Sequence, residues 1–135
     1  REQLKRFEES GQLSILNHTM AIDLLTFSHN ADDPLLRYAP STCFGAYAFD
    51  WKNSQVQVIK AKKTALATGG AGQLFLHTTN APGVYGHGIA MAKRIGARIM
   101  DMEFVQFHPT VFYEEGQPAK FLLSETLRGE GGELV

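Results

Sequence analysis

Residues 64–72 read Thr-Ala-Leu-Ala-Thr-Gly-Gly-Ala-Gly, a small apolar run that ends in a glycine-rich turn. The apolar part predicts a short buried strand. Glycines without side chains then let the backbone approach a ligand closely. The turn alone is a weak signal, because it has neither the lysine and hydroxyl residue of a phosphate-binding loop nor the spacing Gly-x-Gly-x-x-Gly. Taken alone, the stretch is better interpreted as an ordinary tight turn. Only the neighbouring segments can indicate whether the turn binds a ligand.

Upstream of this stretch, the sequence predicts a helix and then antiparallel strands. Residues 1–10 form an amphipathic, charged pattern that Gly11 would end. Residues 28–42 are rich in Asn, Asp and Pro and predict a polar loop, and residues 52–54 predict a turn. Apolar and aromatic runs predict short strands at residues 13–16, 20–27, 43–51 and 56–59. The last three of these strands would make an antiparallel meander.

Downstream, a polar loop at residues 78–80 precedes Gly86-His87-Gly88, which predicts the start of a helix. One face of that helix is expected to pack in the core and carries Ile89, Ala92, Ile95, Gly96 and Ile99. Its amino end is different, because free backbone N–H groups and the helix dipole favour an anion or an electron-rich group there.

Two later stretches carry ionisable side chains beside apolar ones. Residues 104–110 read Phe-Val-Gln-Phe-His-Pro-Thr, and residues 124–132 read Ser-Glu-Thr-Leu-Arg-Gly-Glu-Gly-Gly. His108 precedes a proline, which pushes its backbone towards an extended conformation. A fixed imidazole can bind or protonate an anionic substrate near neutral pH. The second stretch adds a hydroxyl, a carboxylate and a guanidinium within about one helical turn, at Ser124, Glu125 and Arg128.

Each of these features also has an ordinary structural interpretation. A histidine before a proline is more often a turn residue than a catalyst. Glu125 and Arg128 could form a solvated helical pair worth about 0.2–0.5 kcal/mol. Together, however, the two stretches predict one pocket for a small acid, with apolar walls from Phe104, Val105, Phe107, Phe121, Leu122 and Leu123.

Composition limits the class of protein. The chain has 135 residues, 44% of them hydrophobic, which suits one globular domain with a core, and its net charge of −1 argues against a nucleic-acid partner. A single cysteine, Cys43, excludes an internal disulfide and fits a reducing, cytoplasmic compartment. No apolar run approaches the roughly 18–20 residues of a membrane span. The five histidines lack metal-ligand spacing, so no metal is expected.

Taken together, the motifs resemble the succinate dehydrogenase/fumarate reductase flavoprotein superfamily. They occur in this order, at residues 67–72, 78–80, 88–92, 102–110 and 124–132. Within the superfamily, residues 121–131 are most similar to the aspartate oxidases. The alternative within the superfamily is a flavoprotein subunit of a fumarate reductase or succinate dehydrogenase, docked on an iron–sulfur partner.

The resemblance implies an α/β fold: part of a doubly wound FAD-binding domain with an antiparallel β-meander, followed by the start of a capping domain. Residues 1–103 would belong to the first domain and residues 104–135 to the second. The superfamily's amino-terminal Gly-x-Gly-x-x-Gly loop has no counterpart here, and its downstream arginines would fall beyond Val135. The chain is therefore expected to be an internal piece of a larger enzyme and inactive in isolation. A non-catalytic fragment or interaction module is the third hypothesis.

The resemblance also assigns roles to residues. The main chain at Met20 and Ala21 would touch the adenine end of FAD. The remaining cofactor-binding positions would be Ala67, Thr68, Gly69, Gly70, Thr79, Asn80 and His87, the last standing where the family usually has an FAD-contacting aspartate. His108, Ser124 and Glu125 would bind the substrate. Glu125 and Arg128 resemble the catalytic pair that relays a proton in the reductases.

The activity implied is FAD-dependent oxidation of L-aspartate to iminoaspartate, in the quinolinate branch of NAD biosynthesis. Oxygen or fumarate would accept the electrons, and quinolinate synthase is the protein partner that this activity suggests.

Overall fold

The computed structural model describes residues 2–108, 110–117 and 119–133, with the backbone alone at His29, Asn30 and Arg128. Contacts divide the chain into two compact units, Arg1–Thr64 and Ala65–Val135, and each unit is described by itself. This division differs from the domain boundary expected between residues 103 and 104, which concerns the larger fold and stays a prediction.

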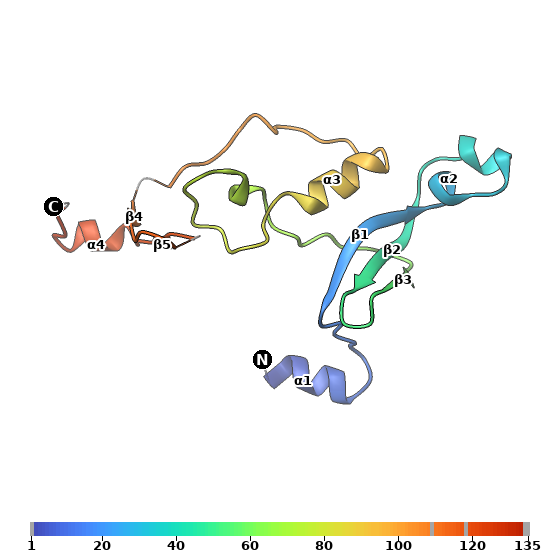
Figure 1. Cartoon of the computed structure of the whole chain (residues 1–135), viewed down its shortest axis with the longest axis horizontal. Coiled ribbons are helices and arrows are strands. Elements are labelled where there is room, and N and C mark those ends of the chain that lie inside the picture. Colours follow the sequence, from blue (N-terminus) through green and yellow to red (C-terminus); the bar gives the residue numbers. More distant parts are fainter. Residues whose placement is uncertain (1, 109, 118, 134–135) are drawn as a thin grey trace. The chain divides into compact units, whose positions relative to one another are not determined.

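The first unit begins with the helix α1 (Glu2–Glu9), as the charged amphipathic pattern predicted (Figure 1). The helix ends before Gly11, which has a φ of 69°. Glycine adopts this left-handed conformation without steric cost, and for that reason it commonly stops helices. The N-terminal helix and its stop are therefore confirmed.

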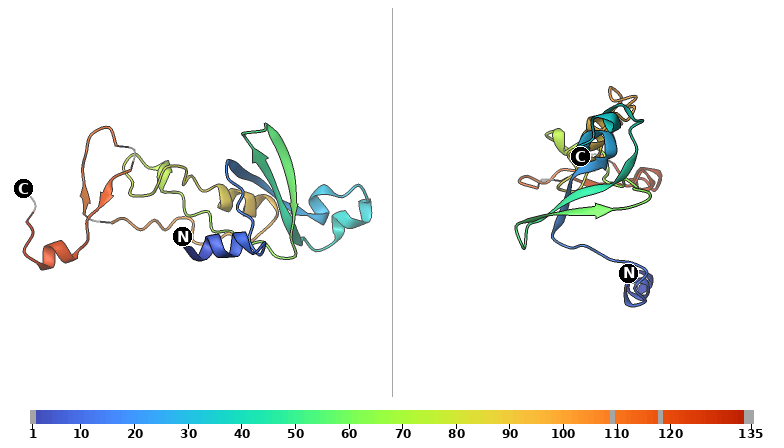
Figure 2. Two further views of the ribbon diagram at one scale, coloured as in Figure 1. Left: turned by 90° about the horizontal axis from the view of Figure 1, so that it is seen from below. Right: turned by 90° about the vertical axis from the view of Figure 1, so that its right-hand side faces the viewer.

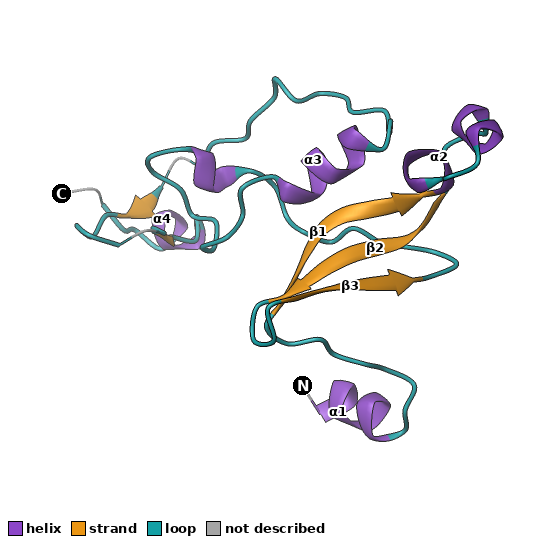
Figure 3. Ribbon diagram, turned by 45° about the vertical axis from the view of Figure 1, so that its right-hand side comes forward, coloured by secondary structure: helices purple, strands orange, loops and turns teal. Residues whose placement is uncertain are grey.

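Three antiparallel strands follow, in the order β1–β2–β3 (Figures 2 and 3). They are β1 (Thr19–Thr26), β2 (Cys43–Asp50) and β3 (Gln55–Lys60). Met20 pairs with Phe49, and Gly45 pairs with Lys60 on the other side of β2. The pairing of β1 with β2 shifts register twice, which bends the strand as β-bulges do. The predicted β-meander is confirmed.

The connection between β1 and β2 holds two short helices, the first of which begins at the last residue of the strand predicted at 20–27 and continues into the predicted polar loop. These are α2 (Phe27–Asn30) and the 3₁₀ helix η1 (Pro34–Tyr38). The Asp33 carboxylate accepts a hydrogen bond from the Leu35 N–H at 2.9 Å, and Pro34 occupies the first helical position. An aspartate cap followed by proline is a typical helix start, since proline lacks an N–H that would otherwise be unpaired.

Two predicted strands do not form. Residues 13–16 are irregular, with Ile15 and Leu16 exposed, and residues 64–68 are also irregular. A strand needs a neighbouring ladder of backbone hydrogen bonds. Within the described ranges no segment supplies such a ladder beside either run. The apolar pattern alone was therefore an insufficient signal.

The apolar core is small. Among the described residues, the buried hydrophobic side chains are Leu24, Leu25 and Ala48 in the sheet and Met91 in the second unit. At the end of β2, the Asp50 carboxylate accepts hydrogen bonds from the backbone N–H groups of Lys52 and Asn53 and from the Asn53 amide. These bonds close the turn between β2 and β3. The single core expected from composition is thus replaced by two weakly filled units.

The second unit contains η2 (Gly72–Leu74), α3 (His87–Arg94), a hairpin of β4 (Val111–Phe112) with β5 (Phe121–Leu122), and α4 (Thr126–Gly129). In the hairpin, Val111 pairs with Leu122 and Phe112 with Phe121. Together with the sheet of the first unit, these elements make a mixed α/β structure in which the described strands all pair antiparallel.

Helix α3 starts where Gly86-His87-Gly88 predicted, with Gly86 left-handed at a φ of 81°. Its predicted apolar face is partly wrong. The helix ends at Arg94, and Gly96 reverses the chain with a φ of 84°, so Ile99 lies beyond the helix. The buried positions are instead Gly88 and Met91, because the helix packs its first turn against the residues before the glycine-rich turn.

Candidate active site

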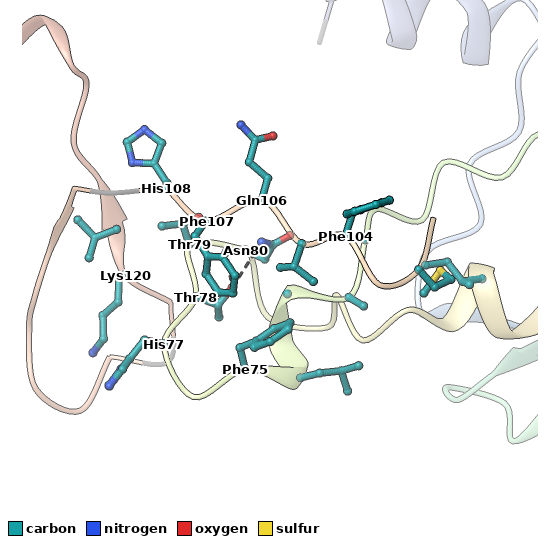
Figure 4. A pocket seen from close by; sticks show the side chains of 18 of the residues that line it. Phe75, His77, Thr78, Thr79, Asn80, Phe104, Gln106, Phe107, His108 and Lys120 are labelled. Atoms are coloured by element: carbon teal, nitrogen blue, oxygen red, sulfur yellow. Dashed lines mark hydrogen bonds between the residues drawn. The ribbon is translucent and has the colours of Figure 1, made fainter. Parts of the chain in front are cut away.

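One pocket of about 630 Å³ lies within the second unit (Figure 4). The loop after the glycine-rich turn forms one wall, and the stretch that leads to His108 forms another. Its lining residues are Gly70, Ala71, Gly72, Leu74, Phe75, His77, Thr78, Thr79, Asn80, Ile89, Asp101, Met102, Phe104, Val105, Gln106, Phe107, His108, Val111 and Lys120. This volume suits a ligand of cofactor or drug size.

The glycine-rich turn is held from one side by the loop at residues 78–80. A Cβ at Gly72 would collide with the amide of Asn80 and the hydroxyl of Thr78. Asn80 is itself fixed, since its N–H donates to Thr78 Oγ1 at 3.1 Å and its carbonyl accepts from Gln73 Nε2 at 2.6 Å. Glycine at position 72 therefore lets the turn and the loop pack together without moving the side chains of Asn80 and Thr78.

The other side of the turn is tied to helix α3. The Gly86 N–H donates to the Gly70 carbonyl at 2.9 Å. A Cβ at Gly88 would collide with the side chain of Thr68, so the helix approaches the chain as closely as a glycine permits. By contrast, a Cβ at Gly70 would meet nothing within 4 Å. The turn thus has a rigid base and one open side where a ligand can reach the backbone.

His108 is an exposed residue at the edge of this pocket, and its ring is anchored through Thr110. The Thr110 N–H lies 3.3 Å from His108 Nδ1, and the Thr110 carbonyl lies 3.1 Å from the same atom. In the neutral ring that accepts from the N–H, the proton sits on Nε2. In the imidazolium, Nδ1–H donates to the carbonyl and Nε2–H remains. Both of these forms present Nε2–H as a donor, which is what a carboxylate needs.

The side chains before His108 alternate in direction. Gln106 and His108 point to one side of the chain, and Phe107 points to the other, towards Phe75 (Figure 4). The rings of Phe75 and Phe107 meet edge to face, with centroids 6.0 Å apart. This contact joins the His108 stretch to the loop that follows the glycine-rich turn, and it gives the pocket an apolar wall beside its polar groups.

The sequence predicted that the stretch beginning at Ser124 shares one pocket with the His108 stretch. The structure does not place it there. Ser124 and Glu125 do not line the pocket, and Phe121, Leu122 and Leu123 do not either. Ser124 instead precedes α4, and its Oγ accepts from the Thr126 N–H at 3.3 Å and donates to Thr126 Oγ1 at 3.0 Å. The side chain of Arg128 lies outside the described residues. The connection to His108 runs through the hairpin, since the Leu123 N–H donates to the Thr110 carbonyl.

The remaining predicted cofactor residues lie in two places. Met20 and Ala21 are exposed on β1 in the first unit. Ala67, Thr68 and Gly69 lead into the turn, and His87 opens α3 with its ring at the edge of Tyr85, centroids 6.0 Å apart. The described residues include no cluster of three or more His, Cys, Asp or Glu side chains that could hold a metal ion.

Sequence reasoning missed His77 and Lys120, which line the pocket, and Tyr113, whose ring contacts both of them. Lys120 lines the pocket with an exposed fraction of only 9%, and its ammonium lies over the Tyr113 ring. A lone lysine between an alanine and a phenylalanine carries no sequence signal for such burial.

In the part of the chain that the structure describes, no helix is long and apolar enough to cross a membrane.

Comparison with known families agrees with this architecture. The model described as "FAD binding domain" matches residues 2–135, so the chain belongs to this family of flavoprotein domains. Its cofactor is accordingly FAD. The open side of Gly70, the polar loop at residues 78–80 and the size of the pocket fit such a dinucleotide.

The proteins to which the chain is similar include several L-aspartate oxidases. L-aspartate oxidase 1 of Ralstonia nicotianae is 46% identical over 123 residues, covering 91% of this chain and 22% of the relative. The chloroplastic L-aspartate oxidase of Oryza sativa subsp. japonica is 38% identical over 139 residues, covering 97% and 20%. That of Pseudomonas aeruginosa is 39% identical over 122 residues, covering 90% and 21%. The chain thus spans about a fifth of the length of these relatives.

Proposed function

We propose that the protein carrying this chain oxidises L-aspartate to iminoaspartate with FAD, in the quinolinate branch of NAD biosynthesis. The observation that carries the proposal is the pocket of the second unit. It joins the open glycine-rich turn of an FAD-binding family to His108, whose imidazolium form would offer Nε2–H to a carboxylate while Nδ1–H donates to the Thr110 carbonyl. The names of the similar proteins support the choice of aspartate.

In the proposed site, the backbone at residues 67–70 would hold FAD, helped by Thr79 and Asn80 on the loop. Met20 and Ala21 would meet the adenine end through their main chain. His87 would contact the cofactor through its ring at the N-terminus of α3. When bound, FAD supplies the acceptor for the hydride that leaves the substrate α-carbon.

The chain's own residues would bind and orient the dicarboxylate. His108 would donate Nε2–H to one substrate carboxylate in a charge-assisted hydrogen bond. Ser124 and Glu125 would bind the remainder of the substrate, and Glu125 with Arg128 would carry a proton to or from it. Because Ser124 and Glu125 lie outside the pocket as described, this role requires substrate or further chain to bring α4 towards His108. Phe107 would help to exclude water, which strengthens these polar contacts.

The larger fold follows from the same proposal. Residues 1–103 would belong to a doubly wound FAD-binding domain, and residues 104–135 would begin a domain that caps the flavin. Oxygen or fumarate would reoxidise the cofactor, quinolinate synthase would receive the unstable imine, and the enzyme would work in the cytoplasm.

The test uses the polypeptide as its gene encodes it, purified and scanned for flavin absorbance. Anaerobic L-aspartate should bleach the flavin, and D-aspartate should serve as a control without effect. Bleaching by succinate but not by L-aspartate would overturn the proposal in favour of a succinate-oxidising flavoprotein. A protein that binds no FAD at all would refute any flavin-dependent activity.

A further inference from the structure

Lys120 is an unusually buried lysine. Its exposed fraction is 9%, whereas lysine is rarely buried unless its charge is compensated. Its Nζ donates to two backbone carbonyls, that of Glu114 at 2.7 Å and that of Gln117 at 3.1 Å. Both carbonyls belong to the loop that joins β4 to β5. The ammonium therefore holds this loop closed across the hairpin.

An aromatic cluster completes the surroundings of the ammonium. Lys120 Nζ lies 4.5 Å from the centroid of the Tyr113 ring, a cation–π distance. The same ring meets His77 edge to face, with centroids 6.0 Å apart. His77 and Lys120 both line the pocket, and Figure 4 shows them at the same end of it. Tyr113 thus links the hairpin loop to the segment that precedes residues 78–80.

The backbone of Lys120 makes a second connection to that segment. Its N–H donates to the Thr78 carbonyl at 2.7 Å. Thr78 in turn accepts the Asn80 N–H through Oγ1. One strand of the hairpin is thereby attached to the proposed flavin loop, while the other strand continues from Thr110, which anchors His108.

We infer that Lys120 is a positioning residue, whose ammonium closes the β4–β5 loop and so fixes His108 relative to the loop at residues 78–80. The inference rests on the proposed function, since His108 is there the group that binds the substrate carboxylate. In this scheme Lys120 contacts neither the substrate α-carbon nor the flavin that accepts the hydride. It acts by holding the hairpin in the one conformation that keeps its backbone bond to Thr78.

The test compares Lys120→Met with Lys120→Arg in the gene-encoded polypeptide loaded with FAD. Methionine keeps an unbranched apolar stem but removes the donors and the charge. We expect KM for L-aspartate to rise about tenfold in Lys120→Met, with kcat changed less than about threefold, because binding geometry is lost while the bound complex still reacts. Lys120→Arg should restore KM to within about threefold of the wild type, since arginine keeps both charge and donors. Lys62→Met, at an exposed lysine of the first unit, is the matched control.

Hydrogen exchange gives a readout that does not need turnover. Peptides covering residues 104–123 should exchange faster in Lys120→Met than in the wild type, with the sheet of residues 19–60 unchanged. If the wild type does not oxidise aspartate, the proposed function fails, and this exchange measurement still decides the role of Lys120. Unchanged exchange, or an unchanged KM, would overturn the inference.

A variant at Tyr113 keeps the inference testable if Lys120→Met does not fold. Tyr113→Leu removes the ring beneath the ammonium from a largely exposed position. It should raise KM in the same direction by about threefold, as the loss of one exposed cation–π contact predicts. An unchanged KM in Tyr113→Leu would contradict the role given to the ammonium.

Discussion

Thr110 controls His108 through its backbone rather than through its side chain. Its N–H and its carbonyl both lie within hydrogen-bonding distance of Nδ1, so the imidazole has a partner in its neutral and its charged form. The ring is therefore held by the backbone of residue 110, and in the proposed function Nε2 would be the atom that meets the substrate.

His108→Asn tests whether Nδ1 holds the ring on Thr110 while Nε2 binds the substrate. Asparagine can still bond to Thr110 from the Nδ1 position, but it offers nothing in place of Nε2–H. A hydrogen bond to a charged group contributes about 1.5–3 kcal/mol, so KM for L-aspartate should rise about 10- to 100-fold. Steady-state kinetics measures this. The control is His18→Asn, because His18 is exposed with a φ of 56°, a conformation that asparagine tolerates. An unaltered KM in His108→Asn would exclude His108 from substrate binding.

Asp50 makes a corresponding prediction for stability. The Asn53 side-chain hydrogen bond, followed by backbone N–H bonds from Asn53 and Lys52, lowers the pKa of the Asp50 carboxyl below its ordinary value. A lowered folded-state pKa stabilises the fold above the unfolded-state pKa, and that stabilisation is lost as the pH falls through the folded-state value. Asp50→Asn should therefore melt at a lower temperature than the wild type at pH 7. The difference should shrink as the pH is lowered past the carboxyl pKa. A difference in melting temperature that is the same at pH 7 and at a pH below the carboxyl pKa would contradict this account.

At the level of elements, glycines set how closely the helix, the turn and the strands can approach. Gly45 on β2 has a φ of 151°, and a Cβ there would collide with the Ile59 carbonyl of β3. Gly88 likewise brings α3 onto Thr68. In both cases an element is fixed by the absence of a side chain, so its position could not be inferred from hydrophobic periodicity.

Gly88→Ala should weaken FAD binding by displacing Thr68 and the turn that follows it. Overpacking of this kind costs about 1–3 kcal/mol. We expect the Kd for FAD, measured by flavin fluorescence on the apo-protein, to rise by the corresponding factor of about 5 to 100. The matched control is Ala90→Ser on the exposed side of the same helix. An FAD affinity equal to that of the control would show that the contact between α3 and Thr68 does not shape the cofactor site.

For the whole molecule, the balance of buried and exposed apolar surface is unusual. The buried hydrophobic side chains of the described residues are few, whereas Phe104, Phe107 and Phe121 are each more than 70% exposed. Burial of apolar area is the main stabilising contribution to folding. The two units therefore need further apolar surface to cover them.

Produced alone, the 135-residue chain should be marginally stable and should not retain FAD. We expect strong binding of a hydrophobic dye, a broad thermal transition and no flavin absorbance after FAD is added and excess is removed. The gene-encoded polypeptide, treated in parallel, is the control. A sharp transition with stoichiometric FAD in the 135-residue chain would contradict this expectation.

Sequence patterns determined the locally encoded parts of this protein. The helix ending before Gly11, the β-meander, the start of α3 at Gly86 and the FAD-binding family all follow from short-range periodicity, turn residues and motifs. The roles of individual residues in FAD and substrate binding stay predictions. They come from motif resemblance, and the structure adds only the geometry around His108 and the glycine-rich turn.

Only the tertiary structure decided which segments have neighbours. Residues 13–16 and 64–68 have strand-like patterns but no ladder beside them among the described segments. Ser124 and Glu125 lie outside the pocket that His108 lines, and Lys120 is buried through carbonyls of a loop that no motif marks. Helix ends and turns depend on adjacent residues, whereas a strand or a shared pocket needs segments that are distant in sequence. The burial of Lys120 depends on how the loop that joins β4 to β5 folds back on its own residues, which no local pattern marks.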